Sequence, residues 1–340
     1  MGTQMDYPVK ITILGAGAIG CTLAARLILA GHSQVSLIAR GENLRVLKSE
    51  GIYLRDCYGE HHVKPAQVVE QATELGPQDV VFIATKGNAL SGLAHQLAPL
   101  LHAQTMVIPL INGIPFWYFY EGQKTTEVKP VLSVDPDQDL LTQYPLPQII
   151  GAVVFITAEQ QSYGRVQSSN PYLLIFGEPN HRMSRRLKQL QELFEGTQIE
   201  ARLSKQIRDQ IWTKVIANLS SNPLSVITGA TLRDIYSHPC LHDITLKMTH
   251  EIRQVAASYG ARVSIDPKTF LNLGRDMGDI HTSMWYDYQK KQPLELNSIA
   301  QAVLELAEHY ECDMPMTRHI CQLTQYISEK SRQQDVQQSA

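Results

Sequence analysis

The segment IWTKVIANLSSNPLSVI, residues 211–227, places one cation and two amides at helical spacing. Lys214, Asn218 and Asn222 recur every four residues and therefore share one face of a predicted helix, flanked by small side chains. An ammonium and two amides could line a pocket for an oxyanion, because all three groups donate hydrogen bonds. A solvated helix face is the alternative, although such a face usually carries more Glu, Lys and Gln. The pattern alone favours neither interpretation.

A second segment, HTSMWYDYQKKQPLELNSIAQAV (residues 281–303), combines a hydroxyl group with acidic side chains. Ser283, Asp287 and Glu295 lie around a short break at residues 291–293. Glu295 opens a predicted helix, where a glutamate commonly does no more than complement the helix dipole. From the residues alone, that structural role is the favoured interpretation of Glu295.

A glycine-rich turn near the start of the chain predicts a dinucleotide site. Residues 9–14 form an apolar run typical of a buried strand, GxGxxG follows, and apolar residues then recur at helical spacing. In such a unit the glycines allow a tight turn, close approach to a pyrophosphate and close helix packing, while the helix N-terminus favours the phosphates. A glycine turn without a ligand is the less favoured alternative. The predicted cofactor-binding residues are Gly15, Ala16, Gly17, Ala18, Ile19 and Gly20.

Arg40 directly follows the second predicted strand, residues 34–39. NAD-binding proteins carry an acidic residue about 20 positions after the glycines, where it holds the ribose 2′-hydroxyl. A guanidinium there suits a 2′-phosphate instead, so the sequence favours NADP(H) over NAD(H). Glu42 lies nearby and weakens this preference, and a solvated surface arginine is the alternative interpretation.

Two further predicted strands end in polar residues. Residues 79–85 run up to Lys86, and residues 105–111 run up to Asn112-Gly113. Ligands of open α/β sheets bind beyond the carboxyl ends of the strands. We therefore expect Lys86 to reach cofactor phosphate or ribose, and Asn112 to hydrogen-bond the nicotinamide ribose or the substrate, although either could be a plain loop residue.

The elements that must position these residues fall into two domains. The chain has 340 residues, too many for one ordinary core, and its pattern changes near residue 200. We expect an α/β Rossmann-type domain over residues 1–200, an all-α domain over 201–330 and a polar, frayed tail over 331–340.

Within the first domain we predict a helix at 89–101, a loop-rich connection at 120–148 and a helix at 184–195. Strands at 151–157 and 172–176 are expected to add to the sheet in antiparallel fashion. The predicted helices of the second domain cover residues 204–219, 240–259, 267–290, 294–310 and 316–330.

Composition excludes several other classes of function. The net charge is −3, so nothing argues for nucleic acid or an anionic membrane as a partner, and no apolar run reaches the ~18 residues of a spanning helix. The chain start does not resemble a secretory leader, and five scattered cysteines favour reduced thiols in a cytoplasmic protein. No metal is expected, because His238, Cys240 and His242 lack a second pair of ligands at zinc spacing.

Five motifs together resemble the ketopantoate reductase (2-dehydropantoate 2-reductase) family over roughly residues 9–328. They are GAGAIG, TK at the end of the third strand, ING, WTKVIANLSSNPLSVI and SMWYDYQKKQPLELN. The resemblance implies a Rossmann domain and a helical domain with the active site in the cleft between them. It also implies NADPH-dependent reduction of 2-dehydropantoate to (R)-pantoate, on the route to pantothenate and coenzyme A.

Roles on the substrate side follow from the same resemblance. Lys214 resembles the proton donor of the family, and Glu295 the glutamate that contacts the catalytic lysine and the cofactor. Asn218 and Asn222 resemble the substrate-binding amides, and Ser283 the serine that holds the substrate carboxylate.

On the cofactor side, Asn112 resembles the family asparagine shared by cofactor and substrate. Arg40 and Lys86 resemble residues near the NADPH phosphates, and Thr157 falls where the family lines the cofactor site with backbone.

The chain departs from the family pattern at two positions. Leu232 stands where the family often has an amide side chain, and Ile280 stands where it has an asparagine. These changes permit one alternative to the expected activity, the reduction of another branched 2-oxo acid. A non-catalytic NADP(H)-binding sensor is a third hypothesis, from a different class of protein. The joint presence of Lys214, Glu295 and Ser283 disfavours the sensor. The apolar stripes of the helices could serve the protein's own core or a homodimer equally.

Overall fold

The computed structural model describes residues 8–338, with side chains described for residues 8–333, and its contacts divide the chain into two compact units. Unit 1 comprises the described residues up to Ile111, together with Phe119–Pro130 and Gln138–Ile207. Unit 2 comprises Asn112–Tyr118, Val131–Asp137 and the described residues from Arg208 onward. This division differs from a single boundary near residue 200, because two short segments of the N-terminal part belong with the helices.

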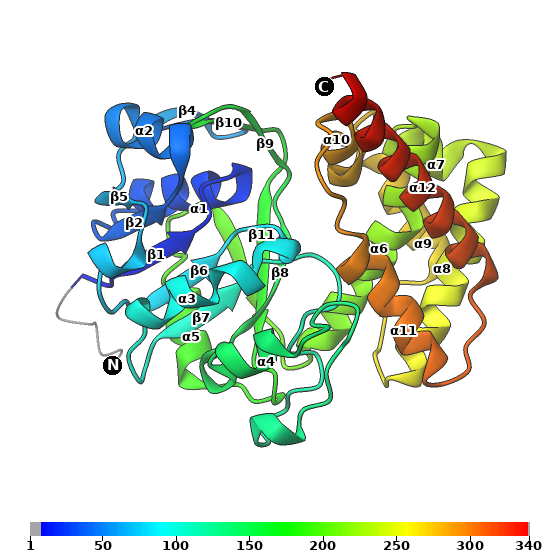
Figure 1. Cartoon of the computed structure of the whole chain (residues 1–340), viewed down its shortest axis with the longest axis horizontal. Coiled ribbons are helices and arrows are strands. Elements are labelled where there is room, and N and C mark those ends of the chain that lie inside the picture. Colours follow the sequence, from blue (N-terminus) through cyan, green and yellow to red (C-terminus); the bar gives the residue numbers. More distant parts are fainter. Residues whose placement is uncertain (1–7, 339–340) are drawn as a thin grey trace. The chain divides into compact units, whose positions relative to one another are not determined.

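A five-stranded parallel sheet of order β5-β2-β1-β6-β7 lies at the centre of unit 1 (Figure 1). Helix α1 (Ala18–Leu29) connects β1 to β2, and its residues 20–27 are buried. Every residue of β1, β2, β6 and β7 is buried, as expected of strands covered on both faces. This topology confirms the predicted Rossmann-type class. The strands are β1 (Ile11–Leu14), β2 (Val35–Ile38), β5 (Gln67–Val69), β6 (Val80–Ile83) and β7 (Met106–Pro109).

Two smaller sheets complete unit 1. β8 (Gly151–Phe155) pairs antiparallel with β11 (Tyr172–Gly177), and β11 pairs in parallel with β12 (Ile199–Leu203). The two predicted strands are therefore present, but they form a sheet of their own and do not extend the five-stranded sheet in antiparallel fashion. A bridge between Val107 and Ile149 links this sheet to β7. The sequence patterns missed the other sheet, whose strands are β3 (Ile52–Asp56), β4 (Gly59–Val63), β9 (Ala158–Ser162) and β10 (Arg165–Ser168).

The helix predicted over residues 89–101 is wrong. The structure has one turn of α-helix there, α3 (Ala94–Leu97), among short 3₁₀ turns, because Gly92 and Pro99 both disfavour a continuous helix. The 120–148 connection contains short helical turns only. The other helical elements of unit 1 are α2 (Gly41–Glu50), η1 (Ala72–Glu74), η2 (Gly87–Ala89), η3 (Ser91–Leu93), η4 (Ala98–Leu100), η5 (Thr125–Glu127), α4 (Asp139–Gln143), η6 (Leu146–Gln148) and α5 (Arg185–Glu192).

Unit 2 is helical (Figure 1). The helix predicted over 267–290 is two helices, because Gly278 between them takes a left-handed φ of 86°. A π-helical turn, residues Asn297–Gln301, precedes α11. Helix α12 continues beyond Lys330 to Gln338, where a frayed tail was expected, and the last two residues of that expected tail, 339–340, lie outside the described residues. The helices are α6 (Ile207–Thr228), α7 (Leu232–Ser237), α8 (Pro239–Ser258), α9 (Pro267–Asp276), α10 (Ser283–Gln289), α11 (Ala302–Glu308) and α12 (Pro315–Gln338).

Segment 112–118 belongs to unit 2 because aromatic and polar contacts attach it to α6. The Trp212 indole N–H donates to Tyr118 Oη at 2.8 Å, and Arg208 Nε donates to the Tyr118 carbonyl at 2.8 Å. Segment 131–137 is held similarly, since the backbone N–H groups of Leu132 and Ser133 donate to the Glu305 carboxylate.

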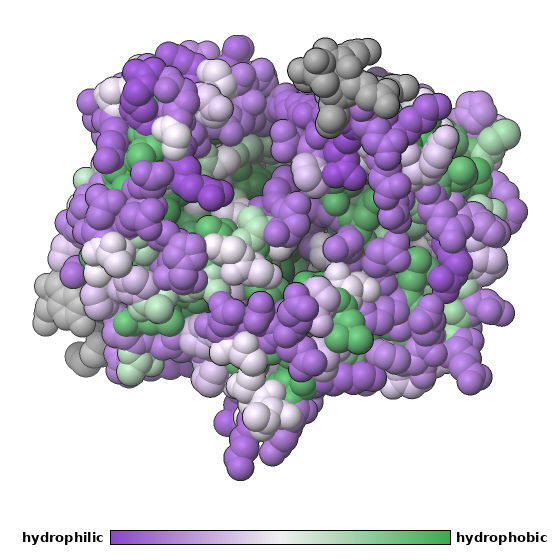
Figure 2. Space-filling model, in the orientation of Figure 1, coloured by the Kyte–Doolittle hydropathy of each residue, from purple (hydrophilic) through white to green (hydrophobic). Residues whose placement is uncertain are grey.

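Hydrophilic residues dominate the face of the molecule shown in Figure 2, where apolar side chains form small patches. Among residues 8–338, no helix is both long enough and apolar enough to cross a membrane.

Candidate functional site

The glycine-rich turn of unit 1 has two positions that no side chain could occupy. Gly15 has a φ of 108°, and a Cβ there would lie 2.6 Å from Thr85 Cγ2. A Cβ on Gly20 would lie 1.9 Å from the Gly15 carbonyl oxygen. These two glycines therefore close the turn against β6 and α1, as the sequence predicted for a dinucleotide fold.

Gly17 differs, because among the described residues no atom beyond its immediate chain neighbours lies within 4 Å of the position that its Cβ would take. It is the N-cap of α1 and its helix end has no side-chain cap, so the first N–H groups of the helix are available to an anion. The buried Thr85 Oγ1 beside the turn has no hydrogen-bond partner within the described part of the chain. Open space, uncapped N–H groups and an unsatisfied hydroxyl fit the pyrophosphate of a dinucleotide.

Thr85 and Asn43 were not predicted as site residues. Asn43 Nδ2 donates to the Ala16 carbonyl at 2.8 Å and so attaches α2 to the glycine turn. Its Oδ1 is buried, and no partner for it lies among the described residues. Thr85 could have been identified from the sequence, because it directly precedes Lys86 in the TK motif at the end of the third strand. Nothing in the sequence pattern indicates that Asn43 contacts the glycine turn.

The remaining predicted cofactor residues occupy strand ends of unit 1. Arg40 is exposed at the N-cap of α2, just after β2. Glu42 forms its ion pair with Arg45, with Nε to Oε2 at 2.8 Å, so its charge is compensated by another arginine. Lys86 is exposed after β6. The Thr157 carbonyl accepts a hydrogen bond from Ser168 Oγ at 2.6 Å.

Helix α6 carries the predicted face of one lysine and two amides. Lys214 and Asn218 are partly exposed, whereas Asn222 is 3% exposed. Ser221 Oγ donates to Asn222 Oδ1 at 3.3 Å. The Asn222 Nδ2 group has no acceptor among the described residues, so it is a buried donor that a ligand oxygen could satisfy.

Lys214, Glu295 and Asn112 form an electrostatic cluster in unit 2. Burial lowers the pKa of Lys214 to about 8, and the negative charge of Glu295 opposes this shift. Glu295 is buried, at 9% exposure, and its Oε2 accepts a hydrogen bond from Asn112 Nδ2 at 3.3 Å. The structure thus brings together three predicted residues, and Glu295 does more than complement a helix dipole.

Ser283 opens α10 and is exposed. The preceding Thr282 caps this helix by accepting from Trp285 N–H at 3.2 Å, so the cap does not require the Ser283 hydroxyl.

The two departures from the family pattern are neighbours, since Leu232 N–H donates to the Ile280 carbonyl at 2.8 Å.

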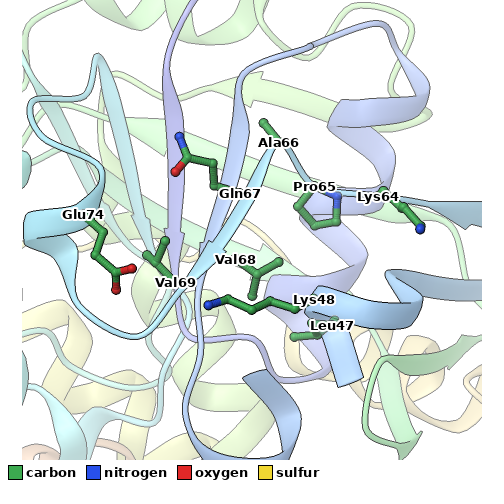
Figure 3. A pocket seen from close by; sticks show the side chains of 9 residues that line it. All are labelled: Leu47, Lys48, Lys64, Pro65, Ala66, Gln67, Val68, Val69 and Glu74. Carbon is green, nitrogen blue, oxygen red and sulfur yellow. The ribbon is translucent and has the colours of Figure 1, made fainter. Parts of the chain in front are cut away.

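Other features contribute no candidate chemistry. No group of three or more His, Cys, Asp or Glu residues in the described chain could hold a metal ion. A groove of about 380 Å³ lies beside edge strand β5 of unit 1 (Figure 3), and none of the predicted site residues lines it. Its lining residues are Leu47, Lys48, Lys64, Pro65, Ala66, Gln67, Val68, Val69 and Glu74.

The model of the ketopantoate reductase PanE/ApbA family matches residues 11–181, and the model of its C-terminal domain matches residues 206–328. The chain belongs to the ketopantoate reductase family. It is 34% identical over 298 residues to a 2-dehydropantoate 2-reductase of Mesorhizobium japonicum, covering 88% of this chain and 91% of that one. This ketopantoate reductase family member is therefore an oxidoreductase, and the resemblance inferred from five motifs is confirmed.

Solved structures agree on the fold of the family. A Ralstonia solanacearum protein described provisionally as a ketopantoate reductase has 31% identity and a TM-score of 0.88, covering 95% of this chain and 99% of its own. A D-mandelate dehydrogenase solved with NADH and anilino(oxo)acetate has 19% identity and a TM-score of 0.81, with coverage of 95% and 99%. The second likeness shows the fold alone.

Proposed function

We propose that this enzyme reduces 2-dehydropantoate to (R)-pantoate with NADPH, and that Lys214 donates the proton. The observation that carries the proposal is the pKa of Lys214. Burial lowers this pKa, the charge of Glu295 raises it, and the resulting value is about 8. At neutral pH this group is protonated, yet it releases its proton more readily than an ordinary lysine.

The reaction requires both a hydride and a proton at one ketone. When bound, the reduced nicotinamide supplies the hydride, which goes to the carbonyl carbon. Negative charge then develops on the carbonyl oxygen, where Lys214 Nζ stabilises it by a hydrogen bond and donates its proton. Glu295 orients Lys214, and Asn112 holds the Glu295 carboxylate. Ser283, Asn218 and the unsatisfied Asn222 amide supply donors for the substrate oxygens.

The glycine turn and the strand ends of unit 1 support NADPH as the cofactor. Gly17 and the N-terminus of α1 would receive the pyrophosphate. Arg40 would bind the 2′-phosphate, since the nearby Glu42 is paired with Arg45. Lys86 and Thr157 remain proposed cofactor contacts.

A second candidate is the reduction of another branched 2-oxo acid. The neighbouring Leu232 and Ile280 favour it, because the chain has two apolar side chains where the family often has amides. Such a pair would accept a more apolar substrate substituent than the hydroxymethyl group of 2-dehydropantoate.

NADPH absorbance, followed with 2-dehydropantoate and a panel of other 2-oxo acids, separates these functions. We expect consumption to be fastest with 2-dehydropantoate. If another 2-oxo acid were reduced and 2-dehydropantoate were not, the second candidate would be established. No consumption with any acid, although NADPH binds, would leave a non-catalytic sensor.

The role of Lys214 is tested by Lys214→Ala. We expect kcat to fall by about a hundredfold or more, because a positioned general acid contributes ~10²–10⁴ in rate, while the Kd for NADPH stays nearly unchanged. Lys247→Ala is the control, since Lys247 is exposed on α8 and pairs with Asp243. Near-normal turnover of Lys214→Ala would refute the assignment.

A further inference from the structure

The π-turn, residues Asn297–Gln301, begins two residues after Glu295 and changes the hydrogen bonding of its helix. In an α-helix the Ala302 N–H would donate to the Ser298 carbonyl. Here it donates to the Asn297 carbonyl instead. The Ser298 carbonyl accepts from a distant segment, the Ile114 N–H, at 2.8 Å. The π-turn thus makes a helix carbonyl available to the chain segment that carries Asn112.

Gly113 brings this segment into direct contact with the π-turn. A Cβ on Gly113 would lie 2.2 Å from Ser298 O and 2.8 Å from Ile299 N. Its φ is 86°, a left-handed conformation that side chains rarely adopt. Both the approach and the backbone conformation therefore require glycine at this position.

The contact determines where the Asn112 side chain lies. Asn112 precedes Gly113, and its Nδ2 donates to Glu295 Oε2 at 3.3 Å. Glu295 in turn precedes the π-turn, and its backbone carbonyl accepts from Ile299 N–H at 3.2 Å. One backbone junction therefore holds both partners of the Asn112–Glu295 hydrogen bond.

We propose that Gly113 and the π-turn form a positioning device that holds Asn112 against Glu295 and thereby orients the carboxylate toward Lys214. Such π-turns often occur at functional sites, and small misplacements of reacting groups are costly, ~10²-fold for about 1 Å. The inference rests on the proposed role of Lys214 as proton donor. Gly113 and Ser298 act only through Asn112 and Glu295, so they are positioning residues.

Gly113→Ala tests the device, with Gly260→Ala as the matched control. Gly260 has a comparable φ of 72°, but in the described part of the chain no atom beyond its immediate neighbours lies within 4 Å of its Cβ position. The control therefore carries the same backbone strain without the clash. We expect Gly113→Ala to lower kcat on the order of ten- to a hundredfold, with a smaller change in KM, while Gly260→Ala retains the wild-type kcat. Wild-type kcat and pH profile in folded Gly113→Ala would overturn the proposal.

A titration of Lys214 distinguishes this proposal from the proposed function. Methyl-labelled lysines can be followed by NMR in the whole protein, with Lys214→Arg assigning the signal. Because the charge of Glu295 raises the pKa of Lys214, its displacement in Gly113→Ala should move the titration to lower pH. This readout needs no turnover, so it tests the device even if no 2-oxo acid is reduced. An unchanged titration in folded Gly113→Ala would count against the device alone.

Two further measurements cover the case in which Gly113→Ala does not fold. Deletion of the exposed Asn297 should restore an α-helical register, so that the Ala302 N–H donates to the Ser298 carbonyl. We expect this deletion to lower the pKa of Lys214, as Gly113→Ala does. In the wild-type protein, the Ile114 amide should exchange slowly with solvent because Ser298 O accepts it. Exchange at the rate of an unprotected amide would contradict the proposal without any variant.

Discussion

The pKa of Lys214 is the result of two opposing effects. Removal from water disfavours the ammonium, and the Glu295 carboxylate favours it; the outcome is a pKa of about 8 rather than the usual 10.5. Such a lysine is mostly protonated at pH 7 and mostly neutral at pH 9. Its acid form is therefore the form that a ketone reduction needs under neutral conditions.

This pKa predicts the pH dependence of the reduction. The proton donor is present below about pH 8 and is lost as pH rises through that value. We expect kcat/KM for the 2-oxo acid to be constant near pH 7 and to fall about tenfold per pH unit above pH 8, because kcat/KM reports the free enzyme. Stopped-flow rates between pH 6 and 10 measure it. A profile that stays constant to pH 10 would contradict Lys214 as the donor.

Arg40 predicts the choice between the two nicotinamide cofactors. Arg40→Ala should weaken NADPH binding by about ten- to a hundredfold, since hydrogen bonds to charged groups contribute ~1.5–3 kcal/mol, and should leave NADH binding unchanged. Cofactor fluorescence titrations measure both. Arg202→Ala is the control, because Arg202 is exposed on β12 and pairs with Glu200. If Arg40→Ala weakened the binding of NADPH and NADH equally, a contact between Arg40 and the 2′-phosphate would be contradicted.

At the scale of elements, the glycine turn combines positions that its own packing requires with one, Gly17, that we propose contacts the cofactor. Gly17→Ala adds a methyl group at a position with a φ of −82°, where no described atom beyond the immediate chain neighbours lies within 4 Å. We expect it to leave Tm unchanged and to weaken NADPH binding about tenfold or more, which corresponds to ~1.4 kcal/mol of lost contact with the pyrophosphate.

Gly20→Ala should have the opposite effect, because its methyl group would lie 1.9 Å from the Gly15 oxygen. Overpacking of this kind costs ~1–3 kcal/mol, so thermal unfolding should show a lower Tm. Calorimetry and fluorescence titration of the two variants measure the difference. If Gly17→Ala lowered Tm as much as Gly20→Ala did, the distinction would fail.

Helix α6 shows why the sequence pattern did not predict where a helix ends. The predicted helix ends at Leu219, but α6 continues to Thr228 with Pro223 in its interior. A proline usually ends a helix, since it lacks an N–H group. Here Leu224 and Val226 are buried beyond it, and tertiary packing of this kind overrides local propensity.

At the scale of the whole molecule, the helical unit includes chain that precedes it by nearly a hundred residues. Tyr118 is 2% exposed, its ring contacts those of Trp212 and Tyr259, and its hydroxyl accepts from the Trp212 indole. A protein cut near residue 200 would lose all of these contacts.

We therefore predict that a fragment of residues 201–340 will not fold cooperatively. Loss of Tyr118 leaves a cavity, which costs ~3–5 kcal/mol for a large aromatic side chain, and it leaves the Trp212 N–H without its acceptor. Near-UV circular dichroism and dye binding should show a loosely packed state, with the full chain as the control. Cooperative thermal unfolding of the fragment would refute this prediction.

The sequence by itself determined the chemistry that the chain offers: a glycine turn between a buried strand and a helix, and Lys214 and Asn218 on one helix face, which Asn222 joins because α6 continues past Leu219. Both follow from spacing within a few turns of chain, which local geometry converts directly into position. Only the tertiary structure decided which groups meet. Asn112 and Glu295 are 183 residues apart, and Leu232 and Ile280 become neighbours only through a backbone hydrogen bond between distant segments. No local periodicity encodes such pairs, because packing between elements brings them together.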